Sequence, residues 1–113
     1  MNERLFVYGT LGPGRPNEHV LKKIGGVFEE ASTTGILHQE GWGADMGYPG
    51  LTLDAEGEKI EGFVFNSENL EEHWSELDDF EGEAYQREVA MVKLRSGKVV
   101  EAFVYTIKGI SHS

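Results

Sequence analysis

A short run of apolar residues near the start of the chain predicts a buried β-strand. Four consecutive apolar residues, 5–8, end at Gly9. The run is too short for a helix, and a continuous apolar run bounded by a glycine is typical of a buried strand. Residues 60–66 place apolar side chains on both faces of an extended segment and predict another strand with both faces at least partly covered.

Helical spacing occurs in two stretches. Asn17 is a good capping residue for a short helix over 18–23, which brings apolar side chains onto one side. A clearer helix is expected to begin at Asn66 or Ser67, because acidic residues fill its first turns. Its apolar positions recur at i, i+4 and i+7: Leu70, Trp74 and Leu77.

The remaining pattern is β-like. Residues 27–53 are interrupted by glycines and predict two irregular strands with a loop between them. Residues 85–94 and 99–107 predict a hairpin across 95–98, with a two-residue connection or a close variant of it. About six strands and two helices that do not alternate strictly predict an α+β fold with a mostly antiparallel sheet, which can curl into a barrel.

Composition and charge narrow the functional classes. A chain of 113 residues is the size of one domain, residues 1–113, and its 39% apolar content supplies a core. The net charge of −10 disfavours nucleic-acid and anionic-membrane partners, and the absence of cysteine excludes thiolate chemistry and Cys-based metal sites. Without a signal-peptide pattern or a long apolar stretch, we expect a cytoplasmic location.

The glycine-containing segment after the first strand, 9–14, has two interpretations. Its backbone N–H groups lack obvious ladder partners and could converge on an anion or a carbonyl oxygen. Alternatively, the glycines serve only a tight exit from the strand. A dinucleotide fingerprint is excluded because Asn17 stands where the third glycine is needed, and a phosphate loop is excluded because no Gly-Lys-Ser/Thr occurs.

Acidic residues cluster where the second predicted helix ends. Asp78, Asp79 and Glu81 lie near the helix C-terminus, where the helix dipole disfavours negative charge. Because like charges close together raise carboxyl pKa values, one acid in such a cluster can serve as a general base. The alternative is a solvated helix end that contributes only solubility. We expect Arg87 to pair with this acidic end, although it could also hold a substrate carboxylate.

The histidines and tyrosines give weaker indications of a functional site. The four histidines have no metal-ligand spacing and are expected to be packed or exposed, so no metal site is predicted. Each tyrosine lies in or beside a predicted strand or turn, and tyrosines in such places line a core edge more often than they contact a ligand. These residues are Tyr8, Tyr48, Tyr85 and Tyr105.

Four motifs in the same order, spread over nearly the whole chain, resemble the γ-glutamylcyclotransferase-like superfamily. Within it, the chain is most similar to the branch of γ-glutamylamine cyclotransferases and AIG2-like proteins. The motifs are Phe6-Val7-Tyr8-Gly9-Thr10-Leu11, Tyr48-Pro49-Gly50, Leu77-Asp78-Asp79-Phe80-Glu81-Gly82 with Tyr85-Gln86-Arg87, and Phe103-Val104-Tyr105. The resemblance implies a small mixed α+β barrel and a pocket bounded by the loop after the first strand.

The resemblance also implies an activity and its residues. The α-amine of a γ-glutamyl amine or amino acid would attack its own γ-carbonyl, releasing the amine and 5-oxoproline without a cofactor. The catalytic glutamate maps onto Glu81, with Glu83, closer to Tyr85, as the alternative base. The substrate contacts map onto Tyr8, Gly9, Thr10, Leu11, Tyr48, Pro49, Tyr85 and Tyr105.

Two questions stay open at this point. A member of the same superfamily without catalysis could use the pocket to bind a small metabolite or to act as a regulatory partner. The oligomeric state is expected to be a monomer or a weak homodimer. The expected partner is a small γ-glutamyl substrate, and neither nucleic acid nor a membrane is expected as a partner.

Overall fold

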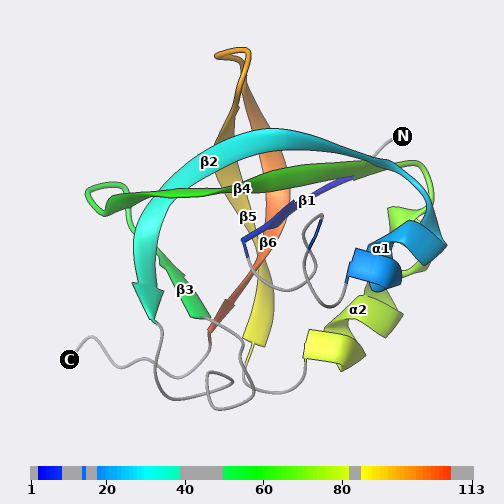
Figure 1. Cartoon of the computed structure of the whole chain (residues 1–113). Coiled ribbons are helices and arrows are strands. Elements are labelled where there is room, and N and C mark those ends of the chain that lie inside the picture. The colour runs from blue at the N-terminus through cyan, green and yellow to red at the C-terminus, as the bar shows by residue number, and fades with distance from the viewer. Residues whose placement is uncertain (1–2, 9–13, 15–17, 39–49, 82–84, 108–113) are drawn as a thin grey trace.

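A strongly bent sheet that closes on itself organises the molecule (Figure 1). The computed structural model describes residues 3–8, 14, 18–38, 50–81 and 85–107. The strands of this part are β1 (Glu3–Val7), β2 (Val27–His38), β3 (Gly50–Leu53), β4 (Glu58–Ser67), β5 (Tyr85–Leu94) and β6 (Val99–Ile107). Their order is β3-β2-β4-β1-β6-β5, and pairing of β2 with β5 closes five of them into a barrel. All pairs are antiparallel except β1 with β6, which confirms the predicted α+β barrel.

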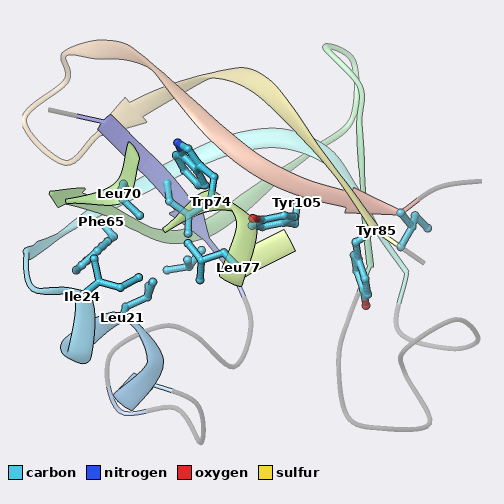
Figure 2. Packing of buried hydrophobic residues seen from close by; sticks show 11 residues of the cluster. Leu21, Ile24, Phe65, Leu70, Trp74, Leu77, Tyr85 and Tyr105 are labelled. Carbon is cyan, nitrogen blue, oxygen red and sulfur yellow. The ribbon is translucent and has the colours of Figure 1, made fainter. Parts of the chain in front are cut away.

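Alternation along the strands separates two hydrophobic clusters. The interior cluster fills the barrel and consists of Phe6, Ala31, Leu51, Ile60, Val64, Ala90, Val92, Val100, Ala102 and Val104. The outer cluster lies between the barrel and the helices and consists of Leu5, Val7, Leu21, Ile24, Phe65, Leu70, Trp74, Leu77, Tyr85, Tyr105 and Ile107 (Figure 2). Successive side chains of a strand point to opposite faces, so β1 contributes Phe6 to the interior and its neighbours Leu5 and Val7 to the outside. Both faces of β1 are therefore buried, as predicted.

Strand β2 is longer and more regular than the sequence suggested. It runs through Gly35 without a break, pairing first with β4 and then, from Gly35 onwards, with β3. A Cβ atom at Gly35 would lie 2.5 Å from the carbonyl oxygen of Thr52, so the glycine permits close approach of the two strands. The glycines of the predicted loop between these strands, residues 41–47, lie outside the described residues.

The two α-helices lie beside each other against one side of the barrel (Figure 1). Helix α1 (Glu18–Ile24) agrees with the predicted short helix and buries Leu21 and Ile24. Helix α2 (Trp74–Glu81) buries Trp74 and Leu77 one turn apart, which is the spacing that places two side chains on one face. Within the described residues, no helix has the length and apolar character needed to cross a membrane.

The predicted start of the second helix at Asn66 or Ser67 is wrong. Both residues end β4, and a short 3-10 helix, η2 (Leu70–Glu72), precedes α2. The hydroxyl of Ser67 donates to the carbonyl oxygen of Gly25 at 2.5 Å and accepts from the backbone N–H of Asn69. The side-chain amide of Asn69 donates to the carbonyl oxygen of Ile24 at 3.0 Å. These bonds hold residues 67–69 against the end of α1, so the capping residues serve a tertiary contact rather than a continuous helix.

The terminal hairpin has the predicted bounds. Strands β5 and β6 pair from Tyr85 with Ile107 to Lys93 with Val99. The connection has a backbone bond from the N–H of Gly97 to the carbonyl oxygen of Leu94, and Gly97 adopts a φ of +97°. This geometry is that of a turn whose last residue is left-handed, a close variant of the two-residue connection that favours glycine.

Candidate active site

The last turn of α2 carries the predicted general base. Trp74 and Leu77 face the strands, whereas Asp78, Asp79 and Phe80 are exposed. Glu81 is the final residue of α2, and its side chain lies outside the described part of the structure. The alternative base, Glu83, lies outside the described residues. The packing of Trp74 and Leu77 thus fixes the position of the helix that presents Glu81.

Asp78, three residues before Glu81, ties this turn to the hairpin. The hydroxyl of Tyr105, on β6, donates to Oδ1 of Asp78 at 2.7 Å. Nη1 of Arg87, on β5, lies 3.2 Å from the same oxygen. The predicted pairing of Arg87 with the acidic helix end is confirmed, because Asp78 is the acid that it contacts.

Aromatic rings hold Arg87 in place. Its guanidinium carbon lies 4.5 Å from the ring centroid of Trp74 and 5.5 Å from that of Phe103. The two rings themselves meet edge to face, with centroids 4.9 Å apart. A cation over an aromatic face is attracted by the ring quadrupole, so this arrangement orients the guanidinium toward Asp78.

Tyr8 connects the end of β1 to the same neighbourhood. Its hydroxyl donates to the backbone carbonyl oxygen of Tyr105 at 2.5 Å and accepts from the backbone N–H of Leu51 at 3.2 Å. The loop predicted to stabilise an oxyanion begins at the next residue, Gly9. Tyr105 therefore links the residue before this loop to the last turn of α2, since its backbone carbonyl accepts from Tyr8 and its hydroxyl donates to Asp78.

The other predicted substrate contacts divide into two groups. Tyr85 is buried in the outer cluster at the start of β5, and Figure 2 shows its ring apart from that of Tyr105. The predicted contacts outside the described residues are Gly9, Thr10, Leu11, Tyr48 and Pro49. The structure thus brings Tyr105 into contact with α2 and Tyr8 into contact with Tyr105.

A hollow of about 940 Å³ lies elsewhere on the barrel surface. Its described lining comes from β1, β2, β4, β5 and the start of β6, and includes Tyr8 but no residue of α2. Glu30 and Arg95, which form an exposed ion pair with a 2.9 Å separation, stand on its border. Among the residues that the structure describes, the hollow and the predicted catalytic turn share no lining residue, and Tyr8 is linked to that turn only through Tyr105.

No metal-binding cluster of histidine, aspartate and glutamate side chains occurs in the described part of the chain. His19 is exposed on α1, and Nδ1 of His73 lies 2.7 Å from the carbonyl oxygen of Asn69. The side chain of His38 and all of His112 lie outside the described part.

Sequence reasoning did not identify the bond between Asp78 and Tyr105. The available signal was the unfavourable position of Asp78 at a helix C-terminus, which called for a compensating donor. Arg87 was recognised as one donor because its charge was visible in the sequence. Tyr105 could not be recognised as the second, since it lies 27 residues away and approaches only through the pairing of β6 with β1 and β5.

Comparison with known proteins identifies the family. The family model described as "Gamma-glutamyl cyclotransferase, AIG2-like" matches residues 5–113. The chain belongs to this family. No curated protein matches the chain.

Several solved structures share the fold of this chain. YkqA from Bacillus subtilis is 31% identical, with a TM-score of 0.72 over 96% of this chain; the chain spans only 36% of YkqA. An AIG2-like protein from Mus musculus is 28% identical, with a TM-score of 0.74 over 98% of this chain and 80% of its own. A structure named gamma-glutamyl cyclotransferase is 16% identical, with a TM-score of 0.70 over 98% of this chain and 69% of its own. At this identity the match shows likeness of fold alone.

Proposed function

We propose that this AIG2-like protein is a cyclotransferase that releases 5-oxoproline from a γ-glutamyl amine or a γ-glutamyl amino acid. The α-amine nitrogen forms a bond to the γ-carbonyl carbon of the same molecule. The bond from that carbon to the leaving nitrogen then breaks. Because attacking and leaving groups belong to one molecule, a pocket that folds the substrate into a near-attack shape removes much of the entropic barrier.

Glu81 is the proposed base. The substrate amine starts as an ammonium, so a carboxylate must accept a proton before attack and can deliver it to the leaving nitrogen. Backbone N–H groups of Gly9, Thr10 and Leu11 are proposed to stabilise the tetrahedral oxyanion. Tyr8, Tyr48, Pro49, Tyr85 and Tyr105 are proposed to bound the substrate pocket.

One observation carries the proposal beyond family membership. The hydrogen bonds from Tyr8 to Tyr105 and from Tyr105 to Asp78 connect the start of the proposed oxyanion loop with the turn that ends in Glu81. Had α2 ended on the opposite side of the barrel from β1, the reaction would have lacked a proton acceptor. This connection supports a single site built from both segments.

The experiment mixes the protein with γ-glutamyl dipeptides, γ-glutamyl-ε-lysine and γ-glutamyl polyamines, and detects 5-oxoproline by mass spectrometry. At least one substrate should give product. Absence of product from all of them, while a positive-control cyclotransferase is active, would contradict the proposal. Binding of one of these compounds without turnover would then identify a non-catalytic metabolite-binding protein.

Matched variants test the base. Glu81→Gln should lower kcat by about 10²- to 10⁴-fold, which is the usual contribution of general acid–base catalysis. Asp79→Asn, at an exposed acid of the same helix, is the control and should retain activity. Full turnover by Glu81→Gln together with loss in Glu83→Gln would transfer the role to Glu83.

A further inference from the structure

Asp78 occupies an electrostatically unfavourable place that the fold compensates with two donors. The carbonyl end of a helix carries partial negative charge, so a carboxylate in the last turn is unfavourable without a compensating donor. The Tyr105 hydroxyl and the Arg87 guanidinium both reach the same oxygen, Oδ1 of Asp78. One donor belongs to β6 and the other to β5. Asp78 is therefore the point at which the last turn of α2 is tied to both strands of the hairpin.

The donors are themselves held firmly. Arg87 lies over the rings of Trp74 and Phe103, and its side chain is only 28% exposed. The ring of Tyr105 is buried in the outer cluster beside α2 (Figure 2). A donor with few accessible rotamers fixes its acceptor more narrowly than a mobile surface side chain does. The turn of α2 is thus fixed by a rigid frame.

The same frame reaches the other half of the proposed site. The backbone carbonyl oxygen of Tyr105 accepts the hydroxyl of Tyr8, the last described residue before the proposed oxyanion loop. Tyr105 therefore contacts the end of β1 through its backbone and the end of α2 through its side chain. Any displacement of Tyr105 therefore changes the relative position of the end of β1 and the end of α2.

We propose that Asp78, Arg87 and Tyr105 form a positioning cluster that fixes the last turn of α2, and with it Glu81, relative to the end of β1. The inference rests on the proposed function, since the role assigned to these residues is to orient Glu81, the base of the proposed reaction. A catalytic group must be held within a fraction of an ångström, and a displacement of about 1 Å can cost about a hundredfold in rate. The cluster supplies that constraint at the one turn that matters for proton transfer.

Steady-state kinetics test the proposal with Asp78→Ala and Asp78→Asn. The alanine removes the acceptor, so kcat should fall by about tenfold or more while KM changes much less. The asparagine retains an oxygen that accepts both bonds and should recover most of the lost rate. Unchanged kcat in Asp78→Ala, or equal losses in the two variants, would overturn the proposal.

Arg95→Gln provides the matched control. Arg95 follows the end of β5 and pairs with Glu30, but both side chains are largely exposed, at 80% and 55%, and neither contacts α2 through an ion pair. Loss of this pair should leave kcat and KM unchanged. A fall in kcat equal to that of Asp78→Ala would show that any lost charge on this surface impairs the enzyme, and would contradict a specific role for the cluster.

Amide hydrogen exchange separates failure of this inference from failure of the proposed function, because it needs no substrate. In Asp78→Ala and in the milder Tyr105→Phe, amides 78–81 should exchange about tenfold faster, while those of α1 and β4 stay protected. Unchanged exchange, or equal acceleration throughout the chain, would refute the positioning role. Absence of 5-oxoproline with the wild-type protein would instead refute the proposed function, and the exchange result would still decide whether the cluster holds the turn.

Discussion

The interior cluster and the outer cluster of this barrel differ in chemistry as well as in place. Aliphatic side chains and one phenylalanine make up the interior cluster, which contains three alanines. The outer cluster contains a tryptophan, two tyrosines and a phenylalanine. A five-stranded barrel has a narrow interior that small aliphatic side chains fill well, whereas the space between helices and strands admits larger rings.

Two charged side chains border the outer cluster. Arg87 lies over the Trp74 ring, and the Tyr105 hydroxyl donates to the Asp78 carboxylate. Tyrosine and tryptophan combine an apolar body with a polar end, so a cluster rich in them can pack and still direct hydrogen bonds. The comparison indicates that the interior cluster mainly stabilises the fold, while the outer cluster also positions the candidate active site.

The largest effect is expected inside the barrel. Phe6 is 1% exposed, and replacement by alanine should lower the free energy of unfolding by about 3–5 kcal/mol, through lost burial and a cavity that the closed sheet cannot collapse. Urea unfolding measures this change. At a temperature where the variant stays folded, its kcat should be close to that of the wild type. A selective loss of kcat in a folded Phe6→Ala protein would contradict the inference that the interior cluster serves mainly stability.

Leu77→Ala tests the outer cluster. Leu77 is 1% exposed on α2, and its truncation should lower the free energy of unfolding by about 2–4 kcal/mol. Because the cavity lies under the helix that carries Glu81, 5-oxoproline formation should fall much more than in Phe6→Ala. Denaturant unfolding and kinetics on the same preparations provide the comparison. Similar kcat values for the two folded variants would contradict it.

The smallest effect of the three is expected at the residue that links the two clusters. Tyr8 packs against the interior cluster, and its hydroxyl bonds to the backbones of Tyr105 and Leu51. Tyr8→Phe keeps the ring and leaves those two backbone groups without this partner, which should cost about 1–3 kcal/mol. Thermal unfolding measures the loss. A stability equal to that of the wild type would show that these bonds do not couple the clusters.

Local signals in the sequence determined most of the fold. The apolar run at 5–8, the helix at 18–23 and the hairpin with its glycine turn follow from periodicity, capping and turn chemistry, which depend on neighbours in the chain. The four ordered motifs identified the family, and the charge of Arg87 predicted its pairing with the acidic helix end. These features needed no knowledge of distant contacts.

Only the tertiary structure decided the features that depend on distant residues. Asn66 or Ser67 was expected to start a helix, but both residues end β4, and the Ser67 hydroxyl bonds to the backbone just after α1. A short polar side chain can bond either to its own helix start or to a distant backbone group, and only the fold decides between them. Tyr105 meets Asp78 only because β6 lies between β1 and β5 in the barrel. Periodicity shows which side chains are buried, but strand order decides which of them meet.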